Sequence, residues 1–345
     1  MKFSLGSLPG CWSSARVGRS LKQIFSTVPL LATLILACQH CELVVAQSQE
    51  ADLPGKNVEA DATPPEIGAK WVRLERDEND DLVGLQTAIV RYVPAAKIKD
   101  QKTSDQQDTA DSTDQPFVDL VGAIHVGDKR YYDELNTHFK QYDALLYELV
   151  APDGSVVTRG RGTSNRHPVG MLQNGMKQML ELEHQLEQID YTKPNFVHAD
   201  MSPDQFSESM RNRGESFLQL YFRLIGQSIG HQSRQANKGQ SIDVQLLTAL
   251  FSRDRSRQLK KVMATQLTEM ESLFLGLGGE EGTTLIAERN KVALQVLKKQ
   301  LAAGKSQLGV FYGAGHLVDM DGRLRKDFGL QPVSVKWVTA WDLTK

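Results

Sequence analysis

Cysteine is scarce in this chain and is confined to one end of it. The 345-residue sequence contains three cysteines, Cys11, Cys38 and Cys41, and none of the residues after position 41 is a cysteine. If the first segment is removed on maturation, the remaining chain has no disulfide, no thiol nucleophile and no thiolate ligand. Any metal site in the rest of the chain would therefore use His, Asp or Glu side chains.

The sequence also lacks an excess of one charge and a long apolar run. Its formal net charge is −2 and it has no basic block, so nothing predicts nucleic-acid binding. The hydrophobic content of 40% and the charged content of 24% are typical of globular proteins. The main apolar run, residues 24–37, is broken by Pro29 and is too short for a comfortable membrane span.

Residues 1–46 predict an export signal. Four basic residues precede the apolar run, and the small-residue cleavage site Val44-Val45-Ala46 follows it. We therefore expect a periplasmic or secreted protein. Two alternatives remain open, namely an uncleaved anchor and lipid attachment at Cys38. We expect no membrane contact apart from this leader or such a lipid.

The rest of the chain is predicted to be one α/β domain, residues 70–345, after a polar linker at 47–69. Residues 95–115 have almost no apolar side chains, which predicts a disordered loop within the domain. Helical spacing dominates residues 167–280, and we expect a helical insertion without strands there. A hairpin is predicted at the start of the domain, around the acidic turn 77–81.

The first half of the domain predicts a parallel strand–helix–strand unit. A buried strand at 117–121 is followed by helical spacing at 128–142 and by an apolar strand at 144–150. Both strands then end at the same edge of the sheet, where open α/β sheets bind ligands. We therefore expect Glu148 to lie beside His125.

The second half repeats this order in outline. A helix at 284–303 leads to a strand at 308–312, a shorter helix at 322–328 and a last strand at 333–341. The expected fold is a mainly parallel sheet built from two such halves. Arg289 lies on the same side of the helix at 284–303 as its apolar residues, so we expect it to face the sheet and to pair with Glu148 or a substrate. A salt bridge with Glu288 is the alternative.

Each half contains the same short motif. Gly122-Ala123-Ile124-His125 and Gly313-Ala314-Gly315-His316 both follow an apolar strand, and Asp128 and Asp319 each lie three residues further on. Gly122 and Gly313 would allow a tight turn or the close approach of a ligand. Two imidazoles at one sheet edge would form a metal site or an acid/base pair.

These residues can supply a metal-dependent reaction. Two histidines and one carboxylate are a common ligand set for a catalytic divalent ion, here His125, His316 and Glu148. Arg289 could bind a carboxylate or stabilise an oxyanion. An Asp of either motif could orient a histidine. The alternative is that each histidine only bonds a backbone carbonyl at the end of its strand.

The paired motifs, Tyr147-Glu148-Leu149 and Glu288-Arg289-Asn290 together resemble the TraB/PrgY/GumN family, which includes the Tiki proteins. The resemblance covers residues 117–150 and 284–325. It implies kinship with the erythromycin-esterase and ChaN haem-binding folds. It also implies that the activity depends on His125, His316, Glu148 and Arg289, with Glu288 and Asn290 beside them.

We therefore expect an exported metal-dependent hydrolase or peptidase that acts on a peptide or a small molecule. The ion would be of the Mn, Co or Zn type. The alternative is a non-catalytic protein that binds haem, metal or peptide at the same edge. The sequence Gly226-Gln227-Ser228-Ile229-Gly230 matches a serine-hydrolase elbow, but helical spacing precedes it where that motif needs a strand.

Overall fold

The computed structural model describes residues 70–95, 115–152, 154–155, 180–216, 219, 242–276 and 282–345. The predicted export signal at 1–46, the linker at 47–69, nearly all of the loop at 95–115 and Ser228 lie outside these residues. Part of the predicted insertion at 167–280 also lies outside them.

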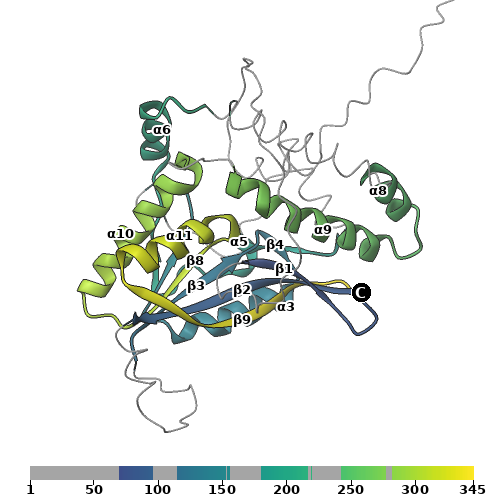
Figure 1. Cartoon of the computed structure of the whole chain (residues 1–345), viewed down its shortest axis with the longest axis horizontal. Helices are drawn as coiled ribbons and strands as arrows, with labels where there is room; N and C mark the ends of the chain where they lie inside the picture. The colour runs from purple at the N-terminus through teal and green to yellow at the C-terminus, as the bar shows by residue number, and fades with distance from the viewer. Residues whose placement is uncertain are drawn as a thin grey trace, which may run out of the picture.

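A mixed β-sheet forms the centre of the described chain, with helices on both of its faces (Figure 1). Its parallel strands lie in the order β3 (Phe117–Ala123), β8 (Gln307–Gly313), β5 (Ala144–Tyr147) and β7 (Phe196–His198). Its antiparallel side consists of β1 (Val72–Arg76), β2 (Leu82–Pro94) and β9 (Leu330–Asp342). The predicted α/β class with a parallel core is confirmed.

Strand β2 organises the antiparallel side. Along one edge it pairs with β9 from Gly84, opposite Asp342, to Pro94, opposite Leu330. Along its other edge it pairs first with β1 and then with β3. The predicted hairpin is therefore confirmed, and the Asp77 carboxylate stabilises its turn by accepting the backbone N–H groups of Asn79 and Asp81, both at 2.9 Å.

Two hydrophobic cores lie on opposite faces of the sheet because strand side chains alternate in direction. Leu145 of β5 belongs to the core that includes α3 (Lys129–His138) and α9 (Arg255–Gly276). The next residue, Leu146, belongs to the core under α10 (Arg289–Ala302) and α11 (Ala314–Asp327). The other α-helices within the described residues are α5 (Gln185–Gln188), α6 (Pro203–Asn212) and α8 (Ile242–Leu250).

The connections of β3 and β8 run in opposite directions. From β3 the chain passes through α3 to β5, whereas from β8 it passes through α11 to β9, on the other side of β3. Since β3 and β8 are neighbours, with Ala123 opposite Gly313, their carboxyl ends form a topological switch point. Such a point is where α/β sheets form a ligand-binding crevice.

The predicted parallel strand–helix–strand unit is present, but β8 lies between its two strands, β3 and β5. The two strands still end at the same edge. The second half follows the order of the first, but its last strand lies beside β2. The order of elements in the sequence does not reveal the order of strands in the sheet, because β8 comes much later in the chain and still lies between β3 and β5.

Two expectations about individual elements are wrong. The predicted insertion contains β7 and the two-residue strand β6 (Glu183–His184), which pairs with β4 (Val126–Gly127). These strands are too short to show a period in the sequence. Helix α11 begins at Ala314 and not at residue 322, because burial of Leu317, Met320 and Leu324 outweighs the poor helix propensity of its glycines.

Candidate functional site

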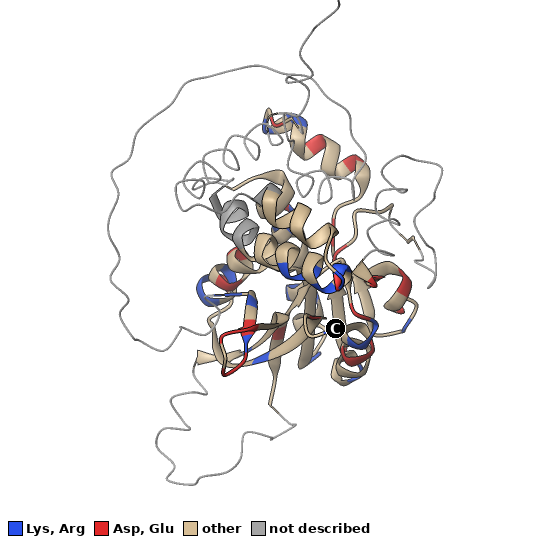
Figure 2. Ribbon diagram, turned by 90° about the vertical axis from the view of Figure 1, so that its right-hand side faces the viewer, with Lys and Arg blue, Asp and Glu red and all other residues tan. Residues whose placement is uncertain are grey.

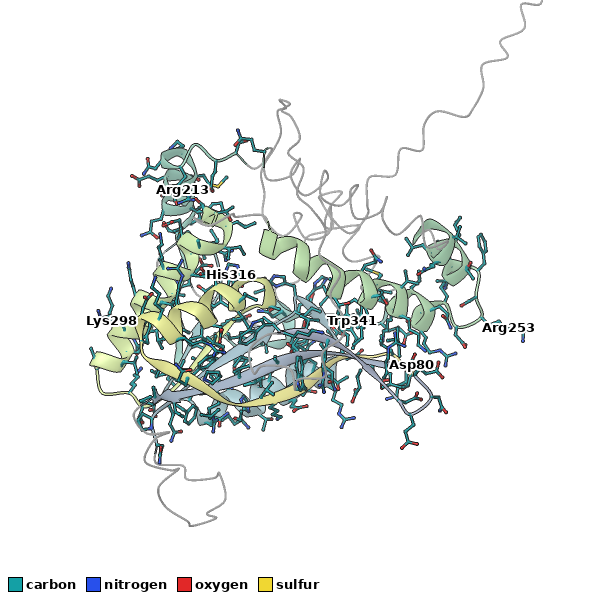
Figure 3. The ribbon with its side chains drawn as sticks, viewed as in Figure 1. Asp80, Arg213, Arg253, Lys298, His316 and Trp341 are labelled. Atoms are coloured by element: carbon teal, nitrogen blue, oxygen red, sulfur yellow. The ribbon has the colours of Figure 1, made fainter. Side chains whose placement is uncertain are left out.

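The carboxyl ends of the four parallel strands bring together charged residues from distant parts of the sequence. Glu148 directly follows β5, and Asp200 lies two residues after β7. His125 lies two residues after β3, and His316 lies in the first turn of α11, directly after β8 (Figure 3). The topological switch point therefore carries a cluster of ionisable side chains.

Glu148 lies at the centre of this cluster. Its Oε1 accepts a hydrogen bond from Nη2 of Arg289 at 2.7 Å and lies 3.4 Å from Nε2 of His316. Its Oε2 accepts the backbone N–H of Gly313 at 2.7 Å. A Cβ at position 313 would lie 3.2 Å from Oε2, so glycine permits this close approach. Both oxygens of Glu148 are thus engaged.

The environment keeps Glu148 ionised. Burial raises its pKa, but His316, when it is protonated, and Arg289 outweigh this effect with their positive charges and hold the pKa well below its usual value. The charge of His125 contributes in the same direction. A carboxylate of this kind is a poor proton acceptor, and it can instead stabilise a neighbouring positive charge.

Arg289 is buried with 2% of its surface exposed and makes charged contacts on two sides. Its Nε and Nη2 bind the two carboxylate oxygens of Asp200 at 2.9 and 2.6 Å, and Nη2 also binds Glu148. Burial lowers the pKa of the guanidinium, but Glu148 and Asp200 raise it above its usual value. The prediction that Arg289 faces the sheet and pairs with Glu148 is confirmed.

Asn290 fixes the orientation of the His316 ring. The Asn290 Nδ2 donates to the His316 carbonyl at 2.9 Å and to the Asp319 carboxylate at 2.8 Å, and neither of these oxygens can donate in return. The Asn290 Oδ1 therefore faces His316 Nδ1, 2.7 Å away, and must accept its proton. In the neutral ring this leaves the Nε2 lone pair directed at Glu148 and Arg289.

Of the other residues predicted to support the site, Asp319 belongs to it, whereas Asp128 and Glu288 lie elsewhere. Asp319 acts on His316 through Asn290, as just described. Asp128 instead accepts hydrogen bonds from Lys260 and from the backbone N–H of Asp342, so its expected role in orienting a histidine is wrong. Glu288 pairs with Arg213 and Lys291 at the surface and not with Arg289.

The expectation that glycine allows a tight turn in both motifs is also wrong. Gly122 lies inside β3, where a Cβ would approach the Ala88 carbonyl oxygen on β2 to 3.1 Å. Gly313 ends β8 with a φ of −51°, which any residue can adopt. At both positions a side chain is excluded because a neighbouring group lies too close, and not because the backbone conformation requires glycine.

The predicted metal ligands do not form a complete donor set. Glu148 and His316 lie together, but the His125 side chain is exposed, and no group of three His, Asp or Glu residues in the described chain is placed to share one ion. The Arg289 guanidinium also donates a hydrogen bond to Oε1 of Glu148, which is the oxygen that faces His316. These residues as described do not fit a three-ligand metal site.

No family model, curated protein or solved structure matches this chain. The resemblance to the TraB/PrgY/GumN family, and the function and localisation that it implies, therefore stay predictions. Among the described helices, none is both long and apolar enough to cross a membrane.

Asp200 is the residue of this cluster that the sequence did not predict. It binds Arg289 through both oxygens and has 5% of its surface exposed. Its position just after β7 corresponds to that of Glu148 just after β5. Recognition of Phe196–His198 as a strand would have placed Asp200 at the same edge of the sheet.

Proposed function

We propose that this chain is an exported hydrolase of the TraB/PrgY/GumN type, in which Glu148 and His316 carry out the reaction and Arg289 positions them. The observation that carries the proposal is the partly buried, ionised Glu148, which lies between Arg289 and His316 at the switch point of the sheet. The substrate would be a peptide or a small molecule with a hydrolysable carbonyl group.

The energetics of the cluster support a functional role. Removing ionised groups from water is costly, and a buried ion pair often contributes less to stability than apolar packing would. Here Arg289 and the Asp200 carboxylate are buried, and the Glu148 carboxylate beside them is largely buried. Shifted pKa values at a ligand-binding edge are typical of active sites. A further sign is the π-helical turn Thr284–Glu288 that precedes Arg289, because such turns are frequent at functional sites.

The chemistry follows from the hydrogen bonds of His316. With its Nδ1 proton held by Asn290, the neutral ring offers Nε2 as a general base towards a water molecule. The water oxygen bonds to the carbonyl carbon of the substrate while its proton passes to Nε2. Glu148 stabilises the resulting imidazolium by its negative charge, and Nε2 then returns the proton to the leaving group as the scissile bond breaks.

Arg289 is a positioning residue in this scheme. Its contacts are with Glu148, His316 and Asp200, and its side chain is almost completely buried. It keeps Glu148 ionised and in place, so that the carboxylate can stabilise a charge on His316.

The predicted divalent ion stays a separate prediction, and none of these steps depends on it. If it is bound, it would activate water as a Lewis acid. The alternative of a non-catalytic protein that binds haem or a peptide also stays a prediction.

Turnover of a panel of chromogenic peptides and esters tests the proposal. We expect His316→Ala to lower turnover at least about 100-fold, the effect typical of losing a general base. His138→Gln, which changes a histidine on α3 away from the site, should have little effect. Equal turnover in the parent and in His316→Ala would refute the proposal. Chelator treatment with metal analysis tests the ion independently, because full activity of metal-free protein would exclude the ion and leave the hydrolase proposal intact.

A further inference from the structure

Strand β9 leaves one of its edges open over part of its length. Along its other edge it pairs with β2, and no described strand lies beyond it (Figure 1). The end of this open edge is covered, because the Asp128 N–H donates to the Ala340 carbonyl and the Trp341 Nε1–H donates to the Val126 carbonyl. Between residues 334 and 339, the backbone bonds to β2 and to no other described segment. This stretch therefore presents unpaired backbone donors and acceptors.

The open stretch is regular and is bounded at both ends. The register with β2 shifts at Val333 and at Ala340, each of which is an extra residue on β9, and it runs without a shift from Ser334 to Thr339. Such bulges bend a strand and interrupt pairing at a sheet edge. Pro332, just before the first bulge, has no N–H to donate. The edge can therefore accept one more strand over a short, defined stretch.

One face of this stretch is apolar and only partly covered. Val335 and Trp337 lie opposite Val90 and Ala88 of β2, which belong to the core under α10 and α11. Val335 nevertheless has 38% of its surface exposed, and Val333 just before the stretch has 40%. A further strand at this edge would cover that apolar surface with its own side chains.

The other face of the stretch is polar and carries both charges. Nζ of Lys336 lies 2.9 Å from Oε1 of Glu134 on α3, and both side chains are exposed. Because each lysine is matched by a carboxylate of its own chain, two copies of this edge can approach each other without a large net repulsion. Figure 2 shows acidic and basic residues interspersed over the described ribbon.

We propose that β9 pairs with β9 of a second copy of this chain, antiparallel and about a twofold axis. Residues that face each other in an antiparallel pair lie on the same face of the sheet. The apolar side chains of Val335 and Trp337 from both copies then meet on one face, and the two Lys336–Glu134 pairs meet on the other. The axis uses the open edge of each copy once, so the assembly closes as a dimer.

This interface should be weak. One strand pair over a short stretch is smaller than the interfaces of stable complexes, which bury about 1,200–2,000 Å² in total. We therefore expect a dimer with a Kd in the micromolar range. Its formation is independent of the proposed hydrolase reaction.

Sedimentation velocity of the purified protein over a range of micromolar concentrations tests the proposal. We expect a reversible equilibrium between monomer and dimer. Val335→Lys should raise the Kd of the dimer at least about tenfold, because it places like charges across the strand pair. Leu247→Lys adds the same charge at an exposed apolar position of α8 and should leave the Kd unchanged. Thermal unfolding checks that both variants fold as the parent does.

Hydrogen exchange locates the interface without any variant. Backbone amides within residues 334–339 should exchange more slowly at concentrations that favour the dimer, whereas those of α8 should not change. The proposal is overturned if the parent is monomeric at every concentration, or if a dimer forms without protection of residues 334–339. It is also overturned if Leu247→Lys weakens the dimer as much as Val335→Lys does, because the interface would then not be specific to β9.

Discussion

At the scale of single residues, Asn290 controls which nitrogen of His316 carries the proton. We expect Asn290→Ala to abolish the preference for Nδ1 protonation in the neutral ring, because the acceptor at 2.7 Å is lost. Turnover should fall roughly 10- to 100-fold, as when a supporting hydrogen bond of a catalytic histidine is removed. ¹⁵N NMR of the imidazole measures the tautomer directly. Asn212→Ala, at an exposed position of α6, serves as the control and should change neither quantity.

Glu148 should make the stability of the protein depend on pH in the acid range. Its pKa is well below the usual value in the folded state, whereas in the unfolded chain it is about 4.3. The unfolded state then binds more protons as the pH falls, so the stabilisation is complete above about pH 5 and is lost towards lower pH. Urea denaturation between pH 3 and about pH 6 measures this. We expect a shallower decline in Glu148→Gln than in the parent, and a decline like that of the parent in the exposed variant Glu78→Gln.

At the scale of elements, Gly313 at the end of β8 and Gly322 within α11 should respond in opposite ways to alanine. Gly313→Ala places a methyl group 3.2 Å from Glu148 Oε2 and should displace the carboxylate, lowering turnover. Gly322→Ala meets no atom within 4 Å, so it should stabilise the helix by about 0.5–1 kcal/mol without affecting turnover. Thermal unfolding and activity assays of both variants check this pair. A Gly313→Ala variant with normal turnover would show that the close contact is dispensable.

Elements that are long and periodic could be predicted from the sequence, whereas those defined by tertiary contacts could not. The hairpin, the buried strand before His125 and the side of α10 that carries Arg289 follow from local pattern. Strand β7 has three residues and takes its conformation from pairing with β5. Asp200 was therefore missed, although it holds Arg289 more completely than Glu148 does. The exposure of the His125 side chain could not be predicted either, because the spacing of residues places His125 at the edge of the sheet but does not say where its side chain points.

At the scale of the whole molecule, one carboxylate joins three distant segments. Asp128, just before α3, accepts from Lys260 of α9 at 3.3 Å and from the backbone N–H of Asp342 at the end of β9. Lys260 has 4% of its surface exposed. We expect Asp128→Ala to lower the free energy of unfolding by about 3–5 kcal/mol, because it leaves a buried charge unpaired.

A double-mutant cycle measured by urea denaturation checks this prediction. Asp128→Ala with Lys260→Met should be less destabilised than Asp128→Ala alone, since no unpaired charge remains. The exposed pair Lys129–Asp133 is the control and should show little coupling. Equal losses in the single Asp128 variant and the double variant would mean that the charge of Lys260 is not the cause.

The pairing of β2 with β9 has a consequence for biosynthesis. These strands come from opposite ends of the described chain, and β9 is the last described strand to leave the ribosome. Until then one full edge of β2 stays open, although every residue from Gly84 to Val90 is buried in the finished sheet. Contacts of such sequence separation form slowly, and an open apolar edge invites pairing with other chains. A nascent or arrested chain should therefore depend on a holding chaperone until its last strand arrives.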